Sequence, residues 1–524
     1  MRDAVAAKPI TAGPAISSIA AIIASAVVVW WQLQHGLWSD VTFYIAANER
    51  LLNGGRLYVD IIDMNLPMAF WSSMPPVWVA SATGLDAVTL TLCWTVLVIL
   101  LSLVLTWHQL TYHDLTYAAR LEILCLIFAV LIAPAGPVFG QREHVMVALT
   151  LPYYVMVAPT LAGSSRSIPH LLVGVTALAA AIGFSIKPYF LIPLCMVEAT
   201  ILFHRKSLRA VLRPETIIVF LLLLAYAIAA LVLTPEYFTT ILPLARATYD
   251  AYVILVAYAM SKPWIVSFCL LAPVAAYFAF RGGRERPLPF IFAIVGFSSF
   301  AAFLAQFKGW PYHLYPAVAF LSISVLLILF VDENDRIRRI TAGSSMRIIC
   351  AFIVALQFFS IHLYWEKHET QRRNIDDMLV RRLDGAQSVM LLSHDLGIQF
   401  PMLRLKGLTW ASSFPAAWSL VGFGEEFART GAPSSSDASR RWAFRFSITK
   451  LVDDFIRYQP EGVIVDIREY SGTVLRGTNP QYLRMLATDP RFDEIWRRYE
   501  LVSRSSEIEI YHLRPTPSPA GGAG

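Results

Sequence analysis

The chain has 524 residues, of which 56% are hydrophobic and only 15% charged, and its mean hydropathy is +0.55. That composition excludes an ordinary soluble protein, because runs nearly free of charge, such as 217–233 and 290–304, are long enough to cross a hydrocarbon core of about 30 Å. The net charge of +6 does not indicate nucleic-acid binding, since the basic residues lie mostly in short loops between apolar runs.

Apolar runs recur along the chain and predict a polytopic α-helical membrane protein with about eleven transmembrane helices. The first run, 16–33, ends in Val-Val-Val-Trp-Trp-Gln-Leu without a small-residue cleavage site, so we interpret it as a retained helix rather than a signal peptide. The predicted spans are 17–34, 87–107, 118–133, 143–162, 169–185, 188–204, 215–234, 263–280, 288–306, 313–331 and 347–364.

Basic residues divide unevenly between alternate loops, which predicts the orientation of the chain. Because Lys and Arg gather in cytoplasmic loops, we expect the richer set inside. The N-terminus is then cytoplasmic, the C-terminal domain lies outside, and 169–185 and 188–204 must be two spans rather than one. The richer set comprises Arg2, Lys8, Arg120, Arg166, Arg205, Lys206, Arg209, Arg213, Arg281, Arg284, Arg286, Arg336, Arg338, Arg339 and Arg347.

The first outside loop, 35–86, opens with a predicted amphipathic helix. Asp40 stands at its start as an N-cap, and Gly54-Gly55 would end it. We expect this helix to lie in the plane of the membrane interface. Asp40 then has two readings, a helix cap or a functional carboxylate fixed at the lipid–water boundary. The apolar stripe of the helix comprises Phe43, Tyr44, Ala47, Leu51 and Leu52.

The loop continues as Arg56-Leu-Tyr58-Val-Asp60-Ile-Ile-Asp63-Met-Asn65-Leu-Pro67, followed by a second apolar helix at 68–80. The motifs W-x-D-x-x-x-Y, G-x-x-L-Y-x-D and D-x-N-x-P resemble the first periplasmic loop of the GT-C glycosyltransferases. The most similar group is the bacterial relatives of protein O-mannosyltransferases and lipid A aminoarabinose transferases. Leu66-Pro67 stands where the relatives often have Pro-Pro. Asp40 stands alone where protein mannosyltransferases have an Asp-Glu pair, and this second difference puts a protein acceptor in doubt.

The resemblance implies a GT-C-like transmembrane domain with a catalytic first loop and a small C-terminal α/β domain in the periplasm. It implies that a sugar passes, with inversion, from a polyprenyl-phosphate carrier to a glycolipid or glycan acceptor at the bacterial inner membrane. Asp40 would then be the general base. Side chains that could contact the substrates are Tyr44, Tyr58, Asp60, Asp63, Asn65, Trp310 and Tyr312.

Cations near the ends of other spans could hold the donor phosphate, whose charge grows as it leaves. All of them fall on the predicted outer face, at a span entrance or beside a proline break. Arg142 could instead pair with Glu143 or snorkel to the head groups, and Lys187 could also be a snorkelling side chain. An aromatic belt would explain Trp310 and Tyr312 without any function. The candidates are Arg142, His144, Lys187, Lys308 and His313. In the loop 235–262, Tyr249, Asp250, Tyr252 and Lys262 could cover the donor lipid.

The composition becomes much more charged after residue 364, which predicts a separate domain. We expect the transmembrane domain at 1–364, an α/β domain at 365–514 and a disordered tail at 515–524. A polar helix is expected at 366–384 and another helix at 446–458, with strands at 388–393, 462–466 and 507–512. His394-Asp395 after the first strand is read as a turn rather than a catalytic site.

Three other functions stay open at this point. A transporter or lipid flippase would show inverted repeats and charges near the midplane of the membrane, and neither is clear here. A surface-glycan polymerase or ligase would use diphosphate-linked donors, and an inactive scaffold would tolerate loss of Asp40. A metal ion is not expected, although Asp60 and Asp63 are possible ligands.

Overall fold

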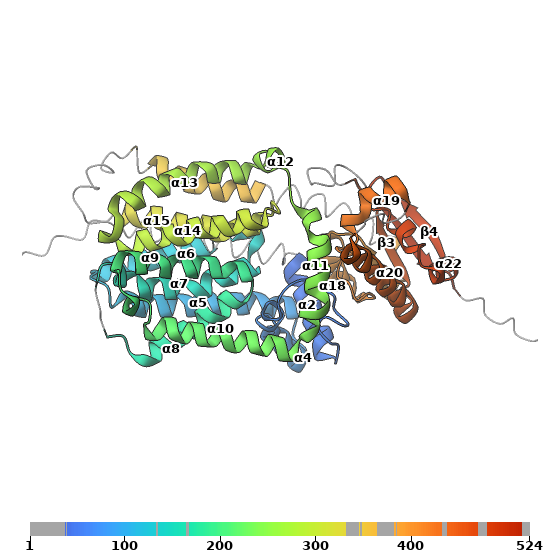
Figure 1. The fold of residues 1–524 in the computed structure, drawn as a ribbon, viewed down its shortest axis with the longest axis horizontal. Helices are drawn as coiled ribbons and strands as arrows, with labels where there is room; N and C mark the ends of the chain where they lie inside the picture. The colour runs from blue at the N-terminus through green and yellow to red at the C-terminus, as the bar shows by residue number, and fades with distance from the viewer. Residues whose placement is uncertain are drawn as a thin grey trace, which may run out of the picture.

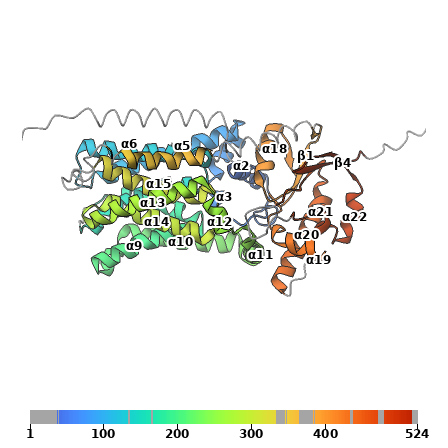
Figure 2. The same ribbon diagram turned by 90° about the horizontal axis from the view of Figure 1, so that it is seen from above.

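A computed structural model describes residues 37, 39–132, 135–163, 167–331, 345, 348–363, 382, 383, 385–431, 437–469 and 479–515. The molecule is elongated. Its apolar helices run along the long axis, and a C-terminal domain containing a β-sheet lies beyond one end of them (Figures 1 and 2). We call this end of the helical bundle the domain end, and the opposite one the far end.

Six helices of the described chain are long and apolar enough to cross a membrane. They are α5 (Ala87–Leu110), α7 (Arg142–Leu161), α10 (Pro214–Leu233), α13 (Pro263–Gly282), α14 (Pro287–Gln306) and α15 (Pro311–Phe330). Shorter helices in other predicted spans are α6 (Tyr117–Ile132), α8 (His170–Ser185), α9 (Leu191–Arg205) and Ile348–Leu363. The predicted span 17–34 lies outside the described residues, so a total of eleven stays a prediction.

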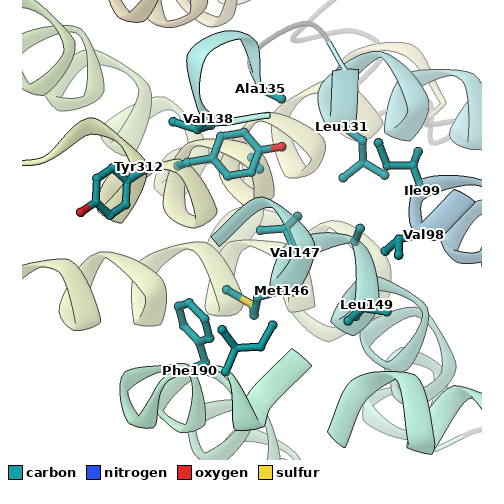
Figure 3. Close-up of a cluster of buried hydrophobic side chains, with 14 of the residues drawn as sticks. Val98, Ile99, Leu131, Ala135, Val138, Met146, Val147, Leu149, Phe190 and Tyr312 are labelled. Carbon is teal, nitrogen blue, oxygen red and sulfur yellow. The ribbon is translucent and has the colours of Figure 1, made fainter. Parts of the chain in front are cut away.

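The bundle is held together by apolar side chains from several helices. Val98 of α5, Leu131 of α6 and Met146 of α7 belong to one buried cluster (Figure 3). α15 buries nearly every side chain, whereas α10 buries only Val219 and Ala230. α15 is therefore central, and α10 presents most of its apolar surface outward, as expected of a helix that faces lipid.

The chain breaks between α8 and α9, as the loop charges predicted. α8 ends at Ser185, and Lys187 has an extended backbone with φ −142°. A short 3-10 helix, η2 (Pro188–Phe190), then leads into α9. Proline restricts the preceding residue to extended conformations, so Pro188 places Lys187 at a helix break at the domain end.

The first loop forms α2 (Ser39–Leu52), α3 (Pro67–Trp71) and α4 (Met74–Thr83). The predicted cap is wrong: Asp40 lies inside the first turn of α2, and its carboxylate pairs with Arg142. Even the polar Thr42 and Asn48 of α2 are buried, because α4 and the C-terminal domain cover this helix. Its position in the plane of the membrane interface stays a prediction.

The C-terminal domain contains a five-stranded mixed sheet in the order β2-β1-β3-β5-β4. β1 (Ser388–Leu392) pairs in parallel with β2 (Thr409–Trp410) and β3 (Gly462–Asp466). β5 (Ile508–Leu513) pairs antiparallel with β3 and with β4 (Tyr499–Arg504). The helices are α18 (Phe400–Lys406), α19 (Gly424–Thr430), α20 (Ala438–Tyr458), α21 (Tyr482–Leu486) and α22 (Pro490–Trp496).

The three predicted strands are confirmed, whereas the predicted helix at 446–458 begins earlier, at Ala438. The predicted helix 366–384 and tail 515–524 lie almost wholly outside the described residues. The domain limits stay predictions.

Loops at the domain end carry the C-terminal domain. Trp418 Nε1 donates to Ile62 O at 3.1 Å, and Ile62 N donates to Ser413 O at 2.8 Å. The loop 235–262 forms a π-helix (Tyr237–Ile241), α11 (Leu242–Thr248), η5 (Tyr249–Tyr252) and α12 (Val256–Met260). α11 packs against α20 between the bundle and the sheet (Figure 1).

Candidate functional site

Asp40 and Arg142 meet at the domain end of the bundle. Arg142 Nη2 lies 3.3 Å from Asp40 Oδ2, and its Nη1 donates to Asn65 Oδ1. Asp63 fixes Asn65 in turn, because Asp63 Oδ1 accepts from the Asn65 backbone N at 2.9 Å and from its side-chain amide at 2.6 Å. The guanidinium also lies 5.3 Å from the ring centre of Tyr44. One arginine of α7 thus contacts both α2 and the later part of the first loop, at Asn65.

The start of α7 directs Arg142 toward this cluster. Gly140 has a φ of +77°, a conformation that favours glycine, and a Cβ there would lie 3.2 Å from Thr95 Oγ1. The chain therefore turns sharply before Gln141 and enters α7 at Arg142. The free N–H groups of a helix N-terminus favour negative charge, so this turn suits an anionic ligand.

A second cluster joins Glu143, Lys187 and His313. Lys187 Nζ contacts Glu143 Oε1, and it lies 3.2 Å from His313 Nε2. The predicted alternative in which Arg142 pairs with Glu143 is wrong. Adjacent residues of a helix point about 100° apart, so Arg142 turns to α2 while Glu143 turns to the α8–α9 break and α15.

Burial changes the protonation of these groups. It raises the pKa of both Asp40 and Asp63, although Arg142 opposes the rise at Asp40 and the Asn65 amides oppose it at Asp63. Burial, helped by the charge of Arg142, lowers the pKa of Lys187 to about 8 against the opposing effect of Glu143. A carboxylate with a raised pKa and a cation with a lowered pKa thus lie in one place, as is common at functional sites.

Several buried polar atoms of the two clusters have no hydrogen-bond partner among the described residues. They are Tyr44 Oη, Arg142 Nε, Glu143 Oε2 and His313 Nδ1. Buried polar groups in proteins are usually satisfied, so four such atoms in one region indicate a place for a polar ligand.

An aromatic wall borders the second cluster. Tyr312 stacks on Trp310 at 5.7 Å between ring centres, and Trp310 lies 6.0 Å from Tyr252. Lys308 Nζ donates to Tyr249 O at 2.5 Å and lies 3.7 Å from the Tyr249 ring centre. Burial lowers the pKa of Lys308 to about 8. Lys308 thus holds η5 against the segment that carries Trp310 and Tyr312, and it does not contact the Glu143 carboxylate.

Three predicted residues have different contacts. The ring of His144 is held by backbone groups on both sides, with Gly140 N at 3.1 Å and Leu131 O at 2.8 Å. Asp60 faces the C-terminal domain, where it lies 2.8 Å from Arg457 Nη1. Tyr58 Oη donates to Asn65 O at 2.5 Å and so holds the Asn65 backbone in place. Lys262 Nζ lies 3.9 Å from the ring centre of Tyr258. The predicted place of Asp250 and Lys262 near the donor lipid stays a prediction.

Sequence reasoning overlooked Glu143 as a site residue. Its signal was available, because a carboxylate at the start of an apolar helix is costly unless a cation meets it. Among the described residues, no group of three or more His, Cys, Asp or Glu side chains is arranged to hold a metal ion. The absence of a metal from the reaction stays a prediction.

Comparison with known proteins bears on the fold. Neither a scan against protein-family models nor a search of curated protein sequences finds a match. Among solved structures, ArnT from Cupriavidus metallidurans in the apo state aligns with a TM-score of 0.53 at 11% identity, over 95% of this chain and 98% of that one. The chain therefore shares the fold of this ArnT structure, which is a GT-C glycosyltransferase. The predicted resemblance is thus confirmed at the level of fold.

Two further structures come from Archaeoglobus fulgidus. The oligosaccharyltransferase AglB, in complex with an inhibitory peptide and a dolichol-phosphate, aligns with a TM-score of 0.46 at 10% identity, over 98% of this chain and 76% of that one. An oligosaccharyltransferase in complex with Zn and sulfate gives 0.42 at 10% identity, over 94% and 73%. In the GT-C-like fold found here, the clusters around Asp40 and Lys187 lie where the bundle meets the C-terminal domain.

Proposed function

We propose that this chain is a membrane glycosyltransferase that moves a sugar from a polyprenyl-phosphate carrier to a glycolipid or glycan acceptor. The observation that carries the proposal is the pairing of a buried carboxylate, Asp40, with Arg142, next to the Lys187 cluster. Such a transfer needs a base for the acceptor and cations for the phosphate. We further propose that the chain lies in a bacterial inner membrane with its domain end in the periplasm.

In the proposed reaction the acceptor hydroxyl attacks the anomeric carbon and gives its proton to Asp40. The bond from this carbon to the phosphate oxygen breaks, and its electron pair leaves with the polyprenyl phosphate. Attack from the face opposite the phosphate inverts the anomeric centre. Arg142 and Lys187 hold the phosphate as its charge grows.

Donor binding would also activate the base. Asp40 is held by Arg142 in the structure, and that contact lowers its basicity. A donor phosphate that takes the Nη2 hydrogen bond of Arg142 would release the carboxylate. Burial, which raises the pKa of Asp40, then favours proton uptake. The base would therefore become strong only once a donor is present.

The test is sugar transfer by the purified full-length chain, supplied with labelled polyprenyl-phosphate sugars and a panel of glycolipid acceptors. Asp40→Asn is expected to fold and to lose roughly a thousandfold in rate. Asp60→Asn is the matched control, because Asp60 lies in the same loop but faces Arg457. Equal rates for wild type and Asp40→Asn would refute the assigned base. Transfer only from diphosphate-linked donors would replace the proposal with a polymerase or ligase.

A further inference from the structure

A second polar site lies at the far end of the bundle, away from Asp40. A cavity of about 480 Å³ opens there, where the ends of α5, α7 and α9 meet the starts of α8 and α10. Its lining includes Arg205, Arg209 and Arg213, and Glu215 is the one carboxylate among the described lining residues. The far end is the side that the loop charges predict to be cytoplasmic.

Arg213 forms a fixed part of the cavity wall. Its Nη2 lies 2.8 Å from Glu198 Oε1, and its Nε lies 2.7 Å from Glu215 Oε1. Tyr153 also donates to Glu198 Oε1 at 2.7 Å. Two carboxylates thus neutralise this arginine and hold it in place, so it is not the group that attracts an anion.

Arg205 and Arg209 carry the uncompensated charge of the cavity. Both side chains are exposed, and neither forms an ion pair with a carboxylate among the described residues. Arg205 also packs against the chain turn at Gly163, where an added Cβ would clash with its guanidinium. Two free guanidinium groups at one opening favour a phosphate group, which arginine can bind through two parallel hydrogen bonds.

Gln109 adds a hydrogen-bond acceptor inside the cavity. Its side chain is 1% exposed, and its amide donates to Thr176 Oγ1 at 3.0 Å. Its Oε1 has no hydrogen-bond partner among the described residues. An unpaired buried acceptor is unfavourable, so the ligand should supply a donor such as a hydroxyl group.

The surroundings of the cavity are apolar. Four large side chains on the segments that form it are more than half exposed, as expected of groups that touch lipid tails. They are Leu171, Phe203, Leu208 and Leu212. A free phosphate ion would make no use of them, whereas a phospholipid would contact both these side chains and the arginines.

A neighbouring cavity gives a natural comparison. It has a volume of about 470 Å³ and shares Tyr112, His113 and Pro159 with the first. Its charged lining residues are Asp114, Glu285 and Arg286, so two carboxylates face one guanidinium. Only the first cavity combines free arginines with an unpaired buried acceptor among the residues that the structure describes.

We propose that the cavity around Arg205 and Arg209 binds the head group of an anionic phospholipid that bears a hydroxyl. The two arginines hold the phosphate, and Gln109 Oε1 accepts a hydrogen bond from the head-group hydroxyl. Basic pockets between transmembrane helices on the cytoplasmic side are suited to anionic head groups. The assignment does not depend on the proposed sugar transfer.

The test is native mass spectrometry of the purified full-length chain titrated with phosphatidylglycerol or phosphatidylcholine. We expect the double variant Arg205→Gln/Arg209→Gln to bind phosphatidylglycerol about 30-fold more weakly, from about fivefold per arginine near an anionic surface. The matched control is Lys206→Asn/Arg281→Gln, which removes two charges from the same end but from residues that line neither cavity. It should bind the lipid as the wild type does.

Two further measurements identify the ligand. Gln109→Met should weaken phosphatidylglycerol but not phosphatidylmethanol, an anionic lipid whose head group has no hydroxyl. An equal effect on both lipids would overturn the role of Gln109. Equal weakening in the control double variant, or no preference over phosphatidylcholine, would overturn the site. Displacement of the lipid by an equal concentration of inorganic phosphate would show a site for free anions and overturn the lipid assignment.

Discussion

The guanidinium of Arg142 lies 3.3 Å from the carboxylate of Asp40, although 102 positions separate them in the sequence. The same guanidinium also binds Asn65, so one side chain connects α7 to both halves of the first loop. An anion that takes one of these hydrogen bonds from Arg142 weakens its contact with Asp40 or with Asn65. The contact therefore links occupancy of the site to the freedom of Asp40.

The geometry at Arg142 predicts that lysine cannot replace it. A lysine ammonium keeps the charge but cannot present two parallel N–H groups to Asp40 and Asn65. We expect Arg142→Lys to lower kcat for sugar transfer roughly 100-fold, as for loss of one preorganised electrostatic contact. Transfer rates measured over a range of donor concentrations would separate this effect from weaker donor binding.

The neutral variant Arg142→Gln distinguishes charge from geometry. Arg142 opposes the rise in the pKa of Asp40, so without its charge that pKa should rise further. The acid limb of the pH–rate profile should then move to higher pH in Arg142→Gln and stay in place in Arg142→Lys. An unmoved limb in the glutamine variant would mean that Asp40 is not the group that titrates.

The lowered pKa of Lys187, about 8, predicts an alkaline limit to activity. The phosphate needs the charged ammonium, which is present below this pKa and lost as the pH rises through it. Donor binding should therefore weaken above about pH 8. The measurement is KM for the donor between neutral and alkaline pH. Lys187→Arg should keep its KM for the donor at high pH, because a guanidinium stays charged there. If KM in this variant still rises with pH as in the wild type, the titrating cation is Lys308 instead.

Much of the bundle could be predicted from the sequence, because a long run without charge is enough to predict a membrane-spanning helix. The break at Pro188 was predictable too, since merging its two flanking helices would have placed basic clusters on both sides. The positions of Arg142 and Lys187 at span ends followed from the same runs. The sequence could not predict the partner of each charged side chain: Arg142 and Glu143 are neighbours, yet they pair with Asp40 and Lys187.

The parts that the sequence did not predict depend on distant contacts. α2 reads as an interfacial helix by its apolar stripe, yet α18, which is far along the chain, covers it, and Phe43 lies 5.1 Å from Phe400 between ring centres. No local pattern predicts such a cover. β4 was missed because it is an edge strand whose side chains are mostly exposed and do not alternate between apolar and polar.

Arg50 is predicted to stabilise the contact between α2 and the C-terminal domain. Its Nη1 donates to Asp60 O at 3.0 Å and to Ser412 O at 2.5 Å, and its guanidinium lies 3.7 Å from the Trp410 ring centre. We expect Arg50→Ala to cost roughly 2 kcal/mol of unfolding free energy, since bonds to charged groups are the stronger kind.

A matched control for Arg50 is Arg457→Ala. Arg457 also joins the first loop to the C-terminal domain, through Asp60, but its side chain is 58% exposed. Exposed ion pairs contribute little, so this variant should lose under about 1 kcal/mol. Unfolding of both variants in detergent, followed by tryptophan fluorescence, measures the difference. Equal losses would contradict the importance of burial at this contact.

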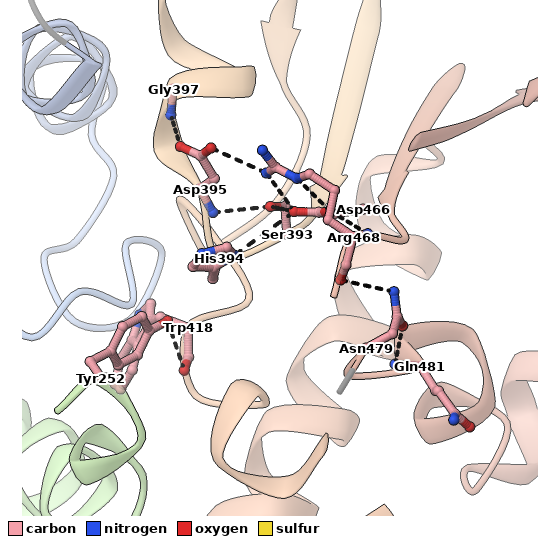
Figure 4. A network of polar contacts seen from close by, with 10 residues as sticks. All are labelled: Tyr252, Ser393, His394, Asp395, Gly397, Trp418, Asp466, Arg468, Asn479 and Gln481. Atoms are coloured by element: carbon pink, nitrogen blue, oxygen red, sulfur yellow. Dashed lines mark hydrogen bonds and ion pairs between the residues drawn. The ribbon is translucent and has the colours of Figure 1, made fainter. Parts of the chain in front are cut away.

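Arg468 is predicted to hold together the ends of two neighbouring parallel strands. It lies 2.8 Å from Asp466 Oδ2 at the end of β3 and 3.1 Å from Asp395 Oδ2 just after β1, and Ser393 completes the network (Figure 4). Arg468→Gln leaves the fully buried Asp466 without its cation. The expected loss is roughly 3 kcal/mol, as for one partner removed from a buried pair.

The pH dependence of the stability lost in Arg468→Gln gives a second readout. Burial opposes ionisation of Asp395, but Arg468, His394 and the Gly397 amide outweigh it and hold its pKa below the usual value. A lowered pKa in the folded state stabilises the protein above the unfolded pKa of about 4, and this contribution is lost as the pH falls through the folded value. The difference in thermal midpoint between wild type and Arg468→Gln should therefore narrow below about pH 4. A difference that stays constant with pH would show that Arg468 acts through packing rather than charge.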